Sequence, residues 1–143
     1  MGVGLPDFWI SWSERSKGAR HIGVSVDVNA GKRNRIFLVR GKGLILGGAI
    51  IAYQDVSQKE DAVGVIVDDR DFTAYEIEFL NMFGFTKNEH TSVFVQKYDD
   101  TNGVYAIGIT RGLSFEKSFG VIYTEKNGVE RTIIILLDYV LIE

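Results

Sequence analysis

The sequence of 143 residues contains no cysteine and only two histidines, His21 and His90. Without cysteine the chain can form no disulfide, no thiol nucleophile and no cysteine-based zinc site. Neither histidine stands near a recognisable catalytic partner, and no phosphate-binding motif of the form G-x-x-x-x-G-K-[S/T] is present. We therefore expect a non-enzymatic protein with no metal and no cofactor. A small enzyme whose site includes His21 or His90 is one alternative.

Long apolar runs are also missing, and we expect no secretory leader segment. The closing apolar run is broken at Asp138, so no stretch reaches the roughly 20 residues that a membrane-spanning helix needs. The first residues, MGVGLPDFWISW, have neither the basic region nor the apolar core of a secretory signal. These absences predict no membrane span and a cytoplasmic location in the cell that makes the protein.

The length of the chain predicts a single domain over residues 1–143, large enough to bury a core without cross-links. Its net charge of −3 hides an asymmetry. Residues 1–50 carry eight Lys or Arg against three Asp or Glu, and residues 51–143 carry eight against sixteen. Such a split favours contacts between copies, or weak, non-specific contact with a polyanion such as nucleic acid. The candidate polyanion contacts are Lys32, Arg33, Arg35, Arg40 and Lys42.

Most of the sequence shows the two-residue period of β-strands. In HIGVSVDVN, for example, the apolar residues Ile22, Val24, Val26 and Val28 alternate with small or polar ones. The run GLILGGAIIAY contains Gly47 and Gly48, which indicate a bulge or bend within a strand. We count about eight or nine short strands separated by turn signals. This spacing predicts an all-β, antiparallel, jelly-roll-like β-sandwich.

One segment has a helical pattern instead. Thr73 and Glu76 match a capping box, and Gly84 stands where a helix would end, so we expect one short inserted helix near residues 74–83. Four large apolar residues share one side of this helix. They are Tyr75, Phe79, Met82 and Phe83.

The last thirteen residues, RTIIILLDYVLIE, follow a turn signal and read as a strand that is apolar on both faces. Asn127-Gly128 predicts a type I′ hairpin that joins this strand to the one before it. One face of the strand can fill a core, and the other needs a cover, such as another copy of the protein. The second face supplies four candidate assembly contacts, Ile134, Leu136, Val140 and Ile142.

Other residue groups have ordinary structural explanations or support an alternative function. Asp68, Asp69 and Asp71, and also Asp99 and Asp100, are typical of turns. Near the N-terminus, two aromatic residues could stack on a ligand, which would fit a carbohydrate- or ligand-binding β-sandwich module. These candidate stacking residues are Trp9 and Trp12.

The order of the elements resembles that of the single jelly-roll capsid or coat proteins of icosahedral viruses. The resemblance covers most of the chain, with VGVIVDDRDFTAYEIEFLNMFGF as strand, turn and helix, followed by strands that end in an apolar one. It rests on layout, and no family site residue is carried over. It implies a self-assembling virion subunit, assembled in the host cytoplasm, whose partners are copies of itself and other coat proteins.

Overall fold

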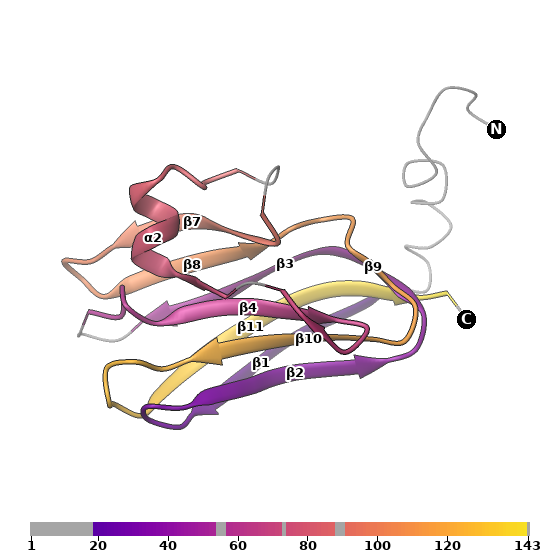
Figure 1. The fold of residues 1–143 in the computed structure, drawn as a ribbon, viewed down its shortest axis with the longest axis horizontal. Coiled ribbons are helices and arrows are strands. Elements are labelled where there is room, and N and C mark those ends of the chain that lie inside the picture. The colour runs from indigo at the N-terminus through magenta and orange to yellow at the C-terminus, as the bar shows by residue number, and fades with distance from the viewer. Residues whose placement is uncertain (1–18, 54–56, 73, 88–90, 143) are drawn as a thin grey trace.

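In a computed structural model the chain forms two antiparallel β-sheets that pack face to face, with one short helix at one side (Figure 1). The structure describes residues 19–53, 57–72, 74–87 and 91–142. Sheet A has the spatial order β1 (Arg20–Val28), β11 (Arg131–Leu141), β3 (Gly43–Tyr53), β8 (Val104–Ile109) and β7 (Val93–Asp99), and β9 (Ser114–Phe115) pairs with β3. Sheet B has the order β2 (Arg33–Arg40), β10 (Ser118–Thr124), β4 (Ala62–Val67) and β5 (Arg70–Asp71), and β6 (Tyr75–Glu76) pairs with β4.

The pairing of the strands is nested from the two ends of the described chain inward. Strand β1 pairs with β11, β2 with β10, β3 with β8, and β4 with β5. Successive pairs belong to alternate sheets, as when a long hairpin is folded over into two layers. This is the arrangement of a jelly roll. The predicted all-β, jelly-roll-like sandwich is therefore confirmed.

Alternation along the strands builds the core between the sheets. In β11, Ile133, Ile135 and Leu137 are fully buried, and each lies between a residue of β1 and a residue of β3. Across the layers, the ring of Phe37 in β2 contacts that of Tyr139 in β11 edge to face, at 5.7 Å between centroids. The main core contains side chains of both sheets and of the helix.

Glycines allow β3 to bend in the middle of sheet A. Gly47 pairs with Asp138 and Ile45 with Tyr139, so Leu46 is an extra residue in β3 and the predicted bulge is present. At Gly43 the backbone approaches β11 so closely that a Cβ atom would lie 2.3 Å from the carbonyl oxygen of Val140. Any larger residue there would push the two strands apart.

The helix, α2 (Ile77–Met82), is shorter than the sequence pattern indicated, because Tyr75 and Glu76 pair with β4 as strand β6. Its N-cap residue Glu76 makes no side-chain capping bond, and Thr73 lies outside the described residues. The helix ends as expected, with Gly84 at a φ of 77° just beyond Phe83. Within the described ranges, no helix is long and apolar enough to cross a membrane.

The predicted hairpin at Asn127-Gly128 is wrong. Strand β10 belongs to sheet B and β11 to sheet A, so the segment between them crosses from one layer to the other. Gly128 still has a positive φ of 74°, which explains why the pair resembled a hairpin turn. The hairpin turn between β7 and β8, in contrast, is present and contains Gly103 at a φ of 66°.

Candidate functional site

The outer face of sheet A carries an apolar surface across its whole width. One row of residues in register crosses all five strands and is apolar throughout: Gly23, Leu136, Ala49, Gly108 and Phe94. The next row contains Ser25, Ile134, Ile51 and Ala106 and ends at Lys97 on the edge strand β7. A sheet face in contact with water is usually polar, so this face has the composition of a surface that becomes covered. We call these two rows the outer rows of sheet A.

The four candidate assembly contacts do not all lie on this exposed surface. Leu136, on the strand next to the edge strand β1, is 42% exposed, and Ile134 on the same strand is half-buried. Ile142 lies beyond the end of β11 and is 44% exposed. Val140 is only 5% exposed, because it packs with Leu44 and Leu46 in a small second core. Of the four, Val140 is thus already covered within one chain.

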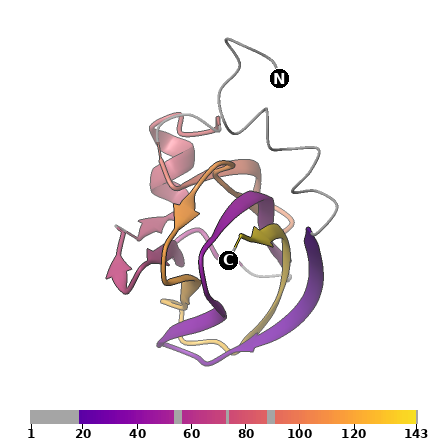
Figure 2. The ribbon, with the colours of Figure 1, turned by 90° about the vertical axis from the view of Figure 1, so that its right-hand side faces the viewer.

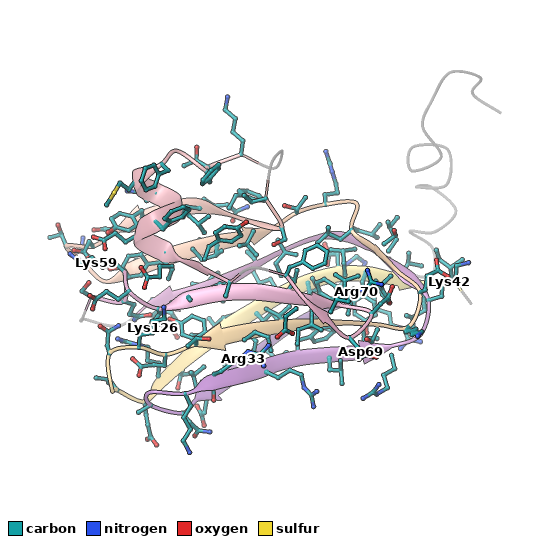
Figure 3. The ribbon with its side chains drawn as sticks, in the orientation of Figure 1. Arg33, Lys42, Lys59, Asp69, Arg70 and Lys126 are labelled. Atoms are coloured by element: carbon teal, nitrogen blue, oxygen red, sulfur yellow. The ribbon has the colours of Figure 1, made fainter. Side chains whose placement is uncertain are left out.

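The five candidate polyanion contacts form a line rather than a cluster. Lys32 stands just before edge strand β2, Arg33, Arg35 and Arg40 lie within it, and Lys42 comes just after it. At about 3.3 Å per residue, Arg33 and Arg40 are roughly 23 Å apart along the strand. Arg33 bonds Asp71 at 2.8 Å, and Lys42 lies 3.7 Å from Glu116 at the far end of the sandwich (Figure 3).

The aromatic side of α2 is exposed, contrary to what its periodicity suggests. The helix buries Ile77 and Leu80 against the core, whereas Met82 and Phe83 are 65% and 61% exposed. Phe79 lies at the centre of a ring cluster, with centroid distances of 4.9–6.1 Å to its aromatic neighbours. We call this surface the aromatic patch; its residues are Tyr75, Phe79, Met82, Phe83 and Phe85.

A buried charge cluster lies where the chain crosses between the sheets, and no sequence pattern predicted it. Asp61, Glu125 and Arg131 are all at most 2% exposed. The Nε atom of Arg131 lies 3.1 Å from Asp61 and 3.4 Å from Glu125. The only signal was position: Asp61 stands directly before one apolar run and Arg131 opens another.

Both carboxylates of this cluster already accept several hydrogen bonds from other groups of the protein. Asp61 accepts bonds from the Tyr123 hydroxyl at 2.6 Å, the Lys126 N–H and the Asn127 side chain. Glu125 accepts four backbone N–H bonds, of 2.7–3.1 Å, from residues 31, 127, 128 and 129. The cluster therefore fixes the crossing segment and leaves little acceptor capacity for a substrate.

The pKa values of the two carboxyls move in opposite directions. Burial raises the pKa of Asp61, although the bonds from Lys126 and Tyr123 and the charge of Arg131 act against it. Burial acts in the same sense on Glu125, but its backbone N–H donors outweigh that effect and hold its pKa below the ordinary value of 4.5. Glu125 is therefore the firmly ionised partner of Arg131.

Asp68 and Asp69 form a turn, as the sequence indicated, whereas Asp71 lies in β5 and Asp99 is the last residue of β7. Asp68 and Asp69 have φ values of 53° and 65° in the tight turn between β4 and β5. The Asp68 carboxylate also accepts the N–H groups of Glu116, Lys117 and Ser118 at 2.6–3.2 Å. No group of three or more potential metal ligands occurs among the described residues.

The remaining candidates are only partly placed. Trp9, Trp12 and His90 lie outside the described residues, so the stacking role of the two tryptophans stays a prediction. His21 is exposed and its Nδ1 atom lies 2.8 Å from Asp138 on the neighbouring strand. A shallow groove of about 360 Å³ runs beside the aromatic patch, between Tyr75, Phe79 and Lys126.

Comparison with known proteins concerns the fold. No protein-family model matches the chain. No curated protein sequence matches it either. Among solved structures it is similar to the capsid of Ralstonia phage GP4, with 13% identity, a TM-score of 0.46 and coverage of 87% of this chain and 86% of that chain. It is also similar to the cyanophage Pam1 capsid asymmetric unit, with 8% identity, a TM-score of 0.45 and coverage of 87% and 85%.

Proposed function

We propose that the protein is a non-enzymatic structural protein, a coat subunit that assembles with copies of itself in a virion. The observation that carries the proposal is the apolar outer face of sheet A, on which Leu136 is the most exposed large apolar side chain of the two outer rows. Jelly rolls are used for virion shells and for lectins, so the fold agrees with this role without selecting it. In the cluster around Arg131 the carboxylates already accept hydrogen bonds from the protein, which supports a structural rather than a catalytic role for these buried charges.

Covering the outer rows of sheet A would stabilise a contact between copies. Full burial of a leucine is worth about 1.5–3 kcal/mol, so completing the burial of a half-exposed one gives on the order of 1 kcal/mol. Ile134 and Ile51 lie beside one another in the next row and would add to this. A lysine at the centre of the same surface would have to lose water, and would weaken the contact.

The test is the solution mass of the purified protein by light scattering, with negative-stain images of the same sample. We expect large regular particles or closed rings, far above the 16.0 kDa of one chain. Leu136→Lys should abolish them without lowering the melting temperature by more than a few degrees. Phe72→Lys is the matched control, because Phe72 is similarly exposed, at 44%, but lies between β5 and β6. A wild-type protein that stays monomeric would contradict the proposal.

A further inference from the structure

The two long edges of the sandwich have complementary surfaces. At one edge α2 packs against β7 and β6 and presents the aromatic patch. At the other edge β1 and β2 end their respective sheets. Figures 1 and 2 place α2 and the β1–β2 edge on opposite sides of the molecule. One copy can therefore present the first edge to the second edge of its neighbour.

The β1–β2 edge leaves the core partly open. Val24 points inward, opposite the fully buried Ile135, yet it is itself 41% exposed. Ile22 and Val26 on the same face of β1 are only partly buried, and so are Phe37 and Val39 of β2, whereas Ile36 of β2 is buried. We call this row the open seam; its residues are Ile22, Val24, Val26, Phe37 and Val39. It is an apolar strip between two edge strands and can receive apolar side chains.

The charges beside the two surfaces are of opposite sign. Glu76 and Glu78 flank the aromatic patch, and Glu60 and Asp100 lie near the start of the helix, where Lys59 ion-pairs with both Glu78 and Asp100. Lys126, the other cation there, is held by Glu76 at 3.0 Å (Figure 3). Beside the open seam, Arg35 and Arg40 are exposed and form no ion pair with any residue that the structure describes. Opposite charges at the rim steer and align two surfaces.

We infer that the aromatic patch of one copy docks into the open seam of a second copy, edge to opposite edge. The exposed Phe79, Met82 and Phe83 supply the side chains that complete the core between β1 and β2, and the acidic rim meets the arginines of β2. Because the two surfaces differ, the contact is heterologous, and repeating it closes a ring or extends a chain of subunits. The inference rests on the proposed self-association but assigns it a second contact, distinct from the outer rows of sheet A.

The absence of cysteine makes a direct test possible, since any disulfide must come from introduced residues. We expect the double variant Val24→Cys/Phe83→Cys to form a ladder of disulfide-linked dimers, trimers and longer species under mild oxidation. Each single variant should remain uncross-linked. The matched control is Ser25→Cys/Phe83→Cys, because Ser25 is adjacent to Val24 but points to the outer face of sheet A. Its ladder should be at least tenfold weaker.

Three results would overturn the inference. They are the absence of a ladder in the double variant, an equal ladder in the Ser25 control, and a dimer formed by Phe83→Cys alone, which would mean that the patch packs on its own counterpart. Failure of the proposed coat function looks different. A disulfide ladder without particles would support the edge contact and contradict the coat role. Particles without a ladder would support the coat role and contradict the edge contact.

Discussion

The buried cluster around Arg131 permits a quantitative prediction. In Arg131→Met a side chain of similar length loses its charge, and two carboxylates remain buried without their cation. Removing one partner of a buried ion pair costs about 3–5 kcal/mol, because the other charge is left uncompensated. At 2–4 °C per kcal/mol for a chain of this size, the melting temperature should fall by roughly 6–20 °C. Thermal unfolding followed by circular dichroism at pH 7 measures this directly.

The control for this variant is an ion pair of the same type that differs in burial. Arg33 and Asp71 are 2.8 Å apart, but their side chains are 54% and 63% exposed. Arg33→Met should therefore cost about 0–1 kcal/mol. The loss of stability caused by Arg131→Met should also become smaller as the pH falls towards the pKa values of the two carboxyls, because protonation removes their unpaired charges. Equal deficits in the two variants, or a pH-independent deficit at Arg131, would refute the reasoning.

Three further predictions concern the turns and the line of basic residues. Gly128→Val should cost about 1–2 kcal/mol from backbone strain alone, because φ is 74° and no atom lies within 4 Å of a Cβ there; a neutral urea midpoint would contradict this. The Lys117 N–H leads the bonds that hold the pKa of Asp68 below 3.8, so its stabilisation is present at neutral pH and is lost as the pH falls through the folded-state pKa. Asp68→Asn, which removes the charge but still tolerates the φ of 53°, should accordingly lower the melting temperature at pH 7 but not near pH 2, and an equal deficit at pH 2 would count against that role. If all five residues of the basic line contact duplex DNA, binding should weaken roughly 10²–10³-fold between 50 and 200 mM salt, and sequence-selective or salt-insensitive binding would rule this out.

The sheets could be predicted from the sequence because their signals are local. Alternation in β1 and β11 places each residue on a face before any partner is known, and Gly47 identifies the bulge. The apolar second face of β11 was visible for the same reason. The burial of Val140 was not, because it depends on Leu44 and Leu46, which lie almost a hundred residues earlier in the chain.

The errors arose where a local signal was compatible with two environments. Asn127-Gly128 specifies positive φ in either a hairpin or a crossing between layers, and only the sheet assignment of β10 and β11 decides between them. The helix was predicted too long because Tyr75 and Glu76 satisfy their backbone groups by pairing with β4. Periodicity identified Phe79 and Phe83 as one side of the helix, but it cannot tell whether that side meets the core or a neighbour.

The nested pairing of the strands has a consequence for biosynthesis. Strand β11 lies between β1 and β3, so sheet A stays divided until residues 131–141 have left the ribosome. Until then, β1 has no strand to pair with in sheet A, and β3 can pair with β8 but not with β11. Folding must therefore be completed after translation of this segment, and contacts so distant in sequence form slowly. During that interval the unfinished edge of β3 is exposed to other nascent chains, and a chaperone that shields it would raise the yield of native protein.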